Sequence, residues 1–199
     1  MIYVFQVIIL VFSAIAHEYM HGWMAHRLGD DTAKNAGRLT LNPLAHLEWF
    51  GSFFLPLIMI VSGMPFVFGW AKPVPYNPYN LKDRKYGDAK VALAGPLANL
   101  AIALAFGLLL RFMPTTNVVF SGLIGLIVYI NLILMVFNLI PIPPLDGSKI
   151  LATFLPPQSR ERYLRNERAG FILIILVVML AGGLVMPIVN WLFKMIVGS

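Results

Sequence analysis

Five apolar stretches of about 20 residues, the length that a helix needs to span a bilayer, dominate this chain of 199 residues. Their approximate bounds are 2–25, 49–70, 91–112, 118–140 and 169–197. Hydrophobic residues make up 59% of the sequence and charged residues only 12%. Soluble domains carry about 25% charged residues, so this composition excludes a soluble enzyme and a disordered chain. We predict an all-α polytopic membrane protein.

Charge and cysteine content exclude further classes. The net charge of +6 does not indicate a nucleic-acid partner, because the basic residues lie in loops between the apolar stretches. The absence of cysteine excludes disulfides, thiolate metal ligands and a cysteine nucleophile. The first apolar stretch has no basic leader and holds three ionisable residues, so we interpret it as a retained helix rather than a signal peptide.

That first stretch contains an HExxH motif, which begins at His17 and ends at His21. Residues i and i+4 share one face of a helix, so the two histidines can bind one metal ion. Zinc suits two imidazoles and lowers the pKa of a bound water to about 7, and Glu18 is close enough to take its proton. Ionisable residues inside a membrane helix are costly and mark functional sites. The alternative is a buried histidine–glutamate pair that only joins helices.

Two histidines and a water leave a tetrahedral zinc ion one ligand short. Among the remaining acids, only Asp146 directly follows an apolar stretch. Pro141, Pro143 and Pro144 end the preceding helix and turn the chain back, and Gly147 permits an unusual backbone angle beside the ligand. We therefore predict Asp146 as the third protein ligand of one zinc ion per chain.

A shared metal ion also constrains the second apolar stretch, residues 49–70. Because Asp146 follows the fourth stretch, the first and fourth stretches must end on the same side of the membrane. Residues 49–70 then make no net crossing, and their prolines and glycines favour a re-entrant or broken hairpin. About four transmembrane helices remain.

The loop charges support this topology independently. With four crossings, thirteen basic residues lie on one side of the membrane and two on the other, whereas five crossings would divide them ten to five. The two are Arg111 and Lys194, and the thirteen are Arg27, Lys34, Arg38, Lys72, Lys82, Arg84, Lys85, Lys90, Lys149, Arg160, Arg162, Arg165 and Arg168. The positive-inside rule then places the zinc site of this cell-membrane protein towards the cytoplasm and the N-terminus outside.

Three motifs together resemble the site-2 protease family of intramembrane zinc metalloproteases, in a short form without a PDZ domain. They are the HExxH motif, the sequence Ala-Gly-Pro-Leu-Ala-Asn at 94–99, and Asn-Leu-Ile-Pro-Ile-Pro-Pro-Leu-Asp-Gly at 138–147. All three occur in the family's order. The resemblance implies zinc binding by the two histidines and by the aspartate of the third motif, with the HExxH glutamate as general base and later proton donor. It also implies a membrane-spanning protein substrate.

The resemblance implies that Asn99 and Asn138 line the site and hold the substrate backbone or the oxyanion. Hydrogen bonding between helices, common for asparagine in membranes, is the alternative for both. His46 lies in a loop rich in turn-forming residues and is a further candidate, for polarising the scissile carbonyl. A lone loop histidine can equally cap or join elements.

The loops 27–48 and 71–90 are expected to contain short strand segments. In the second loop, three prolines within six residues exclude a helix, and an extended edge there could pair with an unwound substrate. A rigid connector is the alternative. We expect residues 1–150 to form the membrane-embedded protease core, and 151–199 to add a cytoplasmic basic loop and a C-terminal membrane segment to the same domain.

A metal transporter, or a metal-binding membrane protein without hydrolytic activity, would use the same three ligands. A hydrolase needs Glu18 as a base, whereas a transporter would tolerate glutamine there. A transporter also needs a polar path to the far side, but the fourth stretch offers no series of acids, only Ser121, Tyr129, Asn131 and Asn138. We therefore favour a zinc endopeptidase whose partners are the bilayer and a membrane-spanning substrate, without nucleic acid. The sequence leaves the oligomeric state open.

Overall fold

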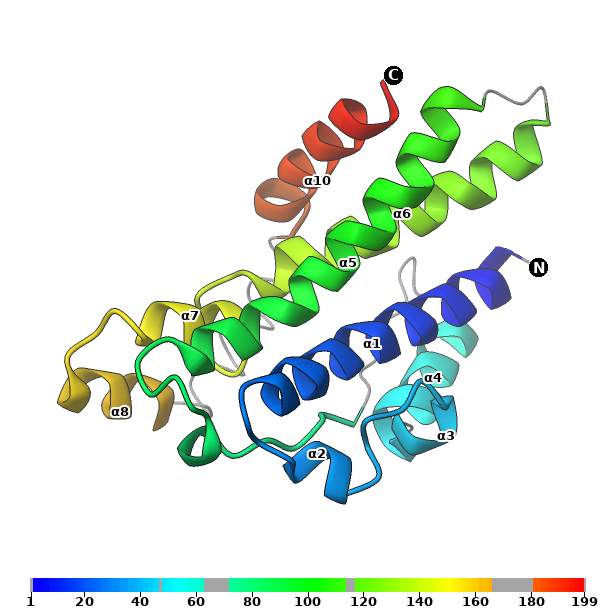
Figure 1. The fold of residues 1–199 in the computed structure, drawn as a ribbon. Helices are drawn as coiled ribbons and strands as arrows, with labels where there is room; N and C mark the ends of the chain where they lie inside the picture. The colour runs from blue at the N-terminus through cyan, green and yellow to red at the C-terminus, as the bar shows by residue number, and fades with distance from the viewer. Residues whose placement is uncertain (1, 47, 63–71, 114–116, 166–180, 199) are drawn as a thin grey trace.

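Three long apolar helices form the frame of the protein (Figure 1). They are α1 (Ile2–Arg27), α5 (Gly87–Phe112) and α6 (Val118–Asn138), and each is long enough to cross a membrane. The computed structural model describes residues 2–46, 48–62, 72–113, 117–165 and 181–198. Within these residues the fold is all-helical, which confirms the predicted fold class.

The helix directions place the C-terminal ends of α1 and α6 at the same end of the bundle. The end of α1 lies beside the residues that lead into α5, because the amide of Lys82 donates to the Leu28 carbonyl over 2.8 Å. Helix α5 then runs back along α1, and α6 returns beside α5 (Figure 1). The first and fourth apolar stretches therefore end at the same end of the bundle, as a shared metal site requires.

A fourth, shorter helix, α10 (Ala181–Val197), packs on α5 and α6. Gly107 of α5 makes room for it, since a Cβ there would lie 2.3 Å from Cγ2 of Ile196. The Arg111 guanidinium donates to the Met195 carbonyl over 2.9 Å. Arg111 and the end of α10 thus share one end of the bundle, opposite the end of α1. The first part of the last apolar stretch, 169–180, lies outside the described residues.

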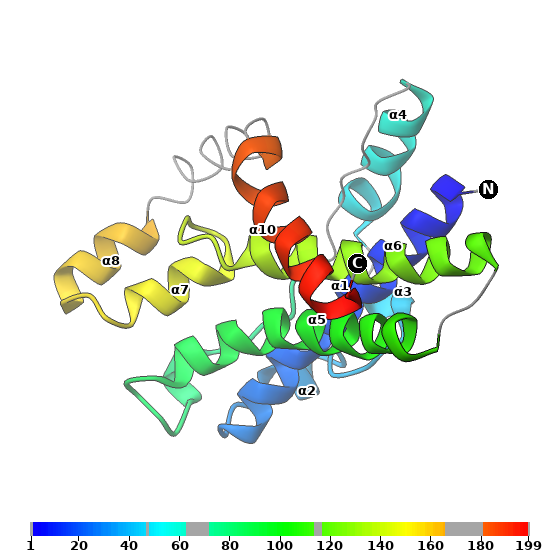
Figure 2. The same ribbon diagram turned by 90° about the horizontal axis from the view of Figure 1, so that it is seen from above.

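The described part of the second apolar stretch is too short to cross a bilayer. It contains the π-helix η1 (Trp49–Phe54) and helix α4 (Leu55–Val61), with 6 and 7 residues, against the roughly 20 that a span needs. Figure 2 shows α4 apart from the bundle of α5, α6 and α10. This agrees with a broken segment near 49–70, of which 63–70 lie outside the described residues.

The expected strand segments were wrong for the described residues of the loops 27–48 and 71–90, which contain no strand. They contain α2 (Thr32–Asn35), α3 (Pro43–His46) and the 3-10 helix η2 (Pro78–Asn80). The buried carboxylate of Asp30 accepts hydrogen bonds from the Thr32 and Asn77 backbone amides and from the Asn80 side chain, so these two backbone donors are not available for strand pairing. Burial alone would raise the pKa of Asp30, but these donors lower it below its ordinary value.

We call the extended residues Lys72–Asn77 the strap, because they join α1 to the end of the bundle that holds α7 (Asp146–Ala152) and α8 (Pro157–Arg165). The Tyr76 hydroxyl donates to Asp88 over 2.5 Å, and Arg160 of α8 binds the other carboxylate oxygen at 2.7 Å. Burial and the Asp88 charge raise the pKa of Tyr76, so the phenol stays a donor.

Candidate metal centre

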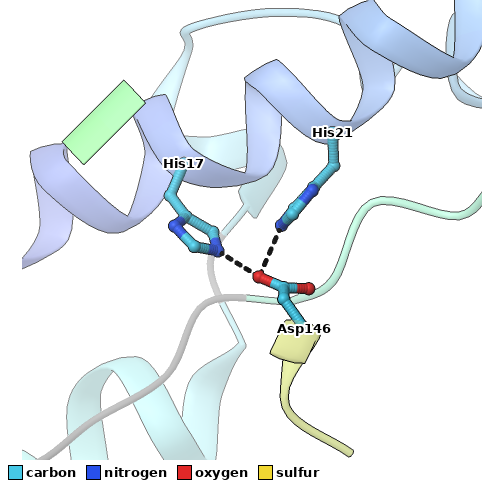
Figure 3. Close-up of side chains that lie close together, drawn as sticks. All are labelled: His17, His21 and Asp146. Atoms are coloured by element: carbon cyan, nitrogen blue, oxygen red, sulfur yellow. Dashed lines mark hydrogen bonds and ion pairs between the residues drawn. The ribbon is translucent and has the colours of Figure 1, made fainter. Parts of the chain in front are cut away.

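Two buried imidazoles project from one face of α1 (Figure 3). His17 and His21 are one helical turn apart and expose 6% and 8% of their surface. Their ring centroids lie 4.6 Å apart, and the ring planes are nearly perpendicular. Both Nε2 atoms point to the same place at the start of α7.

Asp146 lies at that place. Its Oδ2 is 3.0 Å from Nε2 of His17 and 3.2 Å from Nε2 of His21. The turn that carries it needs Gly147, because a Cβ there would lie 2.2 Å from the Leu139 carbonyl oxygen. Gly147 does not have a positive φ, so close approach of the backbone explains this glycine, not the unusual angle that we expected.

The outer nitrogens of both rings have partners that determine which nitrogen carries the proton. Nδ1 of His21 lies 2.7 Å from the Val91 carbonyl, which can only accept, so this nitrogen must donate. Nδ1 of His17 lies 2.6 Å from Oδ1 of Asn99. In the neutral rings both Nε2 atoms then present lone pairs to the Asp146 carboxylate. Acceptor atoms this close together repel one another unless a cation lies between them.

The spacing of the three inner atoms fits zinc. Ligands at about 2.1 Å from a tetrahedral ion lie about 3.4 Å from one another. The two nitrogen–oxygen distances are 3.0 and 3.2 Å, and all three donor atoms lie within 4.8 Å of one another. Gly95 of α5 leaves space beside them, since a Cβ there would lie 2.5 Å from Nε2 of His21 and 2.6 Å from that of His17. The three side chains could therefore hold a metal ion.

Glu18 directly follows His17 in the chain but is not one of the three clustered side chains. Its carboxylate is half-buried, and Oε2 accepts a 2.8 Å hydrogen bond from the backbone N–H of Val74 in the strap. The strap thus contacts the residue that we predict to be the general base.

The other predicted site residues differ in how close they lie to the cluster. Asn99 contacts His17 directly, through the hydrogen bond described above. The Asn138 side chain donates to the Leu134 carbonyl of its own helix over 2.9 Å. His46 is buried and its Nε2 lies 2.7 Å from the Thr40 carbonyl. Among the described residues, neither Asn138 nor His46 is hydrogen-bonded to the three clustered side chains.

Sequence reasoning missed two contributors to the site. Val74 acts through a backbone amide, although Pro73 and Pro75 on either side make it the one residue of the three that can donate. Ser13 accepts a 3.3 Å hydrogen bond at its backbone carbonyl from Asn99, the residue that contacts His17. It lies four residues before His17 and therefore on the same helix face. That spacing could have identified it.

The fold and this cluster indicate a multi-pass membrane protein with three buried side chains that could hold a metal ion, as in a zinc metalloprotease. Residues 113–183 match Peptidase family M50. YwhC of Bacillus subtilis, which is described as a zinc metalloprotease, is 36% identical over 94% of this chain and 86% of its own length. Rip2 of Mycolicibacterium smegmatis, described likewise, is 31% identical over 92% of this chain and 68% of its own length.

A third relative, MJ0611 of Methanocaldococcus jannaschii, also carries the description zinc metalloprotease and is 33% identical over 74% of this chain and 72% of its own length. No solved structure matches the chain. Since two thirds or more of these relatives align, the chain belongs to Peptidase family M50, the site-2 protease family of zinc metalloproteases. The resemblance inferred from the motifs is confirmed.

Proposed function

We propose that this chain is an intramembrane endopeptidase that hydrolyses peptide bonds of membrane-spanning proteins with one zinc ion per chain. The observation that carries the proposal is the buried cluster that Asp146 forms with His17 and His21, two residues of a helix long enough to span the bilayer. His17 precedes the end of α1 at Arg27 by ten residues, or about 15 Å along the helix. The cluster is therefore at a depth that a membrane-embedded peptide could reach.

The residues in and around the cluster have different roles in the proposed reaction. When bound by His17, His21 and Asp146, zinc would lower the pKa of a water to about 7 and polarise the scissile carbonyl. Glu18 accepts the proton of the attacking water and later gives it to the leaving nitrogen. A helical substrate must unwind locally, because its own hydrogen bonds shield the peptide bond. Asn99 supports His17, and we keep Asn138 and His46 as candidates for contacting substrate.

We further propose that the end of the bundle where α1 ends faces the cytoplasm, with the N-terminus outside. Support comes from the loop charges, which divide thirteen to two in this topology. Arg111 and the end of α10, near Lys194, lie together at the opposite end, as that division requires.

Removing the metal tests the proposal directly. We expect the purified protein in liposomes to cleave a membrane-spanning reporter, to lose this activity when a chelator strips the metal, and to regain it with one zinc per chain. Magnesium should not restore activity, because imidazole nitrogens suit zinc and not this oxygen-seeking ion. Cleavage by a metal-free protein would contradict the proposal.

The strap gives a second test, through the N–H that Val74 donates to Glu18. Val74→Pro removes this donor, and we expect kcat to fall about tenfold, the effect of losing one hydrogen bond to a charged group. Zinc content should stay at the wild-type level, because Val74 lies outside the ligand cluster. Val74→Ala is the matched control, since it trims the same side chain but keeps the N–H. Equal kcat values for the two variants would show that the hydrogen bond does not orient the base.

A further inference from the structure

A chain of buried amide groups leads from His17 into the apolar bundle. Asn99 of α5 bonds to His17, and its Nδ2 donates to Oδ1 of Asn131 in α6 over 2.9 Å. Nδ2 of Asn131 donates in turn to the hydroxyl of Ser13 in α1 over 3.0 Å. Both asparagines are completely buried and Ser13 is nearly so. Three helices thus contribute to one hydrogen-bonded network behind a single metal ligand.

Two backbone carbonyls determine the direction of this network. Nδ2 of Asn131 also donates to the Ile127 carbonyl over 2.9 Å, and Nδ2 of Asn99 donates to the Ser13 carbonyl over 3.3 Å. Carbonyl oxygens only accept, so reversing either amide would place two acceptors against each other in a buried site. The NH₂ group of each asparagine must therefore face its carbonyl, and the oxygen of Asn99 must face His17.

We propose that Asn131 and Ser13 are positioning residues that fix the proton of His17 on Nδ1 and so keep Nε2 ready to bind zinc. Because the oxygen of Asn99 faces the ring, Nδ1 must donate, and the lone pair is left on Nε2. This inference rests on the proposed zinc site. It distinguishes the two ligands, since His21 obtains the same orientation from the Val91 carbonyl alone. Of the two histidines, His17 is the one whose orientation involves α6, through Asn131.

Zinc affinity measures this role separately from proteolysis. We would determine the zinc dissociation constant of the detergent-purified full chain by competition with a chelating dye, and record the cobalt spectrum as a check on ligand geometry. Asn131→Leu should weaken zinc binding about tenfold, since loss of a partner behind a ligand typically costs 10–100-fold. Asn190→Leu is the control, because Asn190 is also a helical asparagine but is exposed, hydrogen-bonded to Tyr129 at 2.8 Å and not part of the network behind His17. It should stay within about twofold of wild type.

A double-mutant cycle with Asn99→Leu tests whether Asn131 acts through Asn99. In the Asn99→Leu background, Asn131→Leu should have no additional effect on zinc affinity. Ser13→Ala should weaken zinc binding severalfold and Ser13→Thr should restore it. These two variants, which change the side chain less than the asparagine variants do, test the positioning role if the asparagine variants do not fold.

Each outcome has a definite meaning. A tenfold loss that vanishes in the Asn99→Leu background supports the inference, as does the rescue by Ser13→Thr. Wild-type zinc affinity in folded Asn131→Leu, or an equal loss in both backgrounds, overturns it while leaving the proposed function intact. Absence of zinc binding by the wild-type chain overturns both proposals together.

Discussion

Replacing Glu18 by Gln should reduce cleavage of a membrane-spanning reporter about a hundred- to ten-thousand-fold, the usual contribution of a general acid–base group. Glutamine has nearly the same shape and its carbonyl oxygen can still accept from the Val74 amide, so the strap should stay in place. The variant lacks only the capacity to take and return a proton. Bound zinc should remain at one per chain, because Glu18 is not one of the three clustered side chains that we propose as ligands.

This variant also separates the peptidase from a metal transporter that uses the same ligands. Zinc flux into liposomes, measured beside cleavage, should be absent from both wild type and Glu18→Gln. Zinc transport that persists in the variant would favour the transporter. Loss of zinc from Glu18→Gln would show instead that the glutamate is a zinc ligand, and its assignment as the general base would be wrong. His26→Gln is a suitable control, because this half-buried histidine pairs with Asp31 and is not part of the cluster.

The parts of the site that the sequence predicts are those with a strict local rule. An interval of four residues places His17 and His21 on one helix face wherever that helix lies. Asp146 follows from ligand counting and from its place directly after an apolar stretch, and the structure brings all three side chains together. The helical fold class follows from hydropathy alone, because a bilayer core leaves helices as the simplest way to satisfy backbone donors.

The parts that the sequence does not predict depend on how separate segments cross. A backbone donor has no side-chain signature, so nothing in the residue types shows that the Val74 amide meets Glu18. Asn131 stands out as a polar residue in an apolar stretch, but the sequence does not show that it meets Asn99 and Ser13, because these contacts depend on how α1, α5 and α6 pack. The expected strands failed for a similar reason: Asp30 binds the amides of Thr32 and Asn77, and so competes for the donors that a strand would use.

A single added methyl group should disable the metal centre. In Gly95→Ala, the new Cβ would lie 2.5 Å from Nε2 of His21 and 2.6 Å from Nε2 of His17, closer than carbon and nitrogen can approach. Neither ring can move away without losing a buried hydrogen bond, because the His17 ring is bonded to Asn99 and the His21 ring to the Val91 carbonyl. We therefore expect zinc affinity to fall at least about a hundredfold, the upper end of the effects seen behind metal ligands, and cleavage to be lost.

The substitution should not unfold α5, because alanine is favoured over glycine inside a helix by about 1 kcal/mol. Gly122→Ala provides the matched control: it makes the same change in α6, where an added Cβ meets no atom within 4 Å. Circular dichroism and thermal unfolding of the metal-free proteins should show wild-type helix content in both variants. If Gly95→Ala binds zinc as tightly as Gly122→Ala, the two imidazoles do not converge beside α5, and the geometry assigned to the metal centre is wrong.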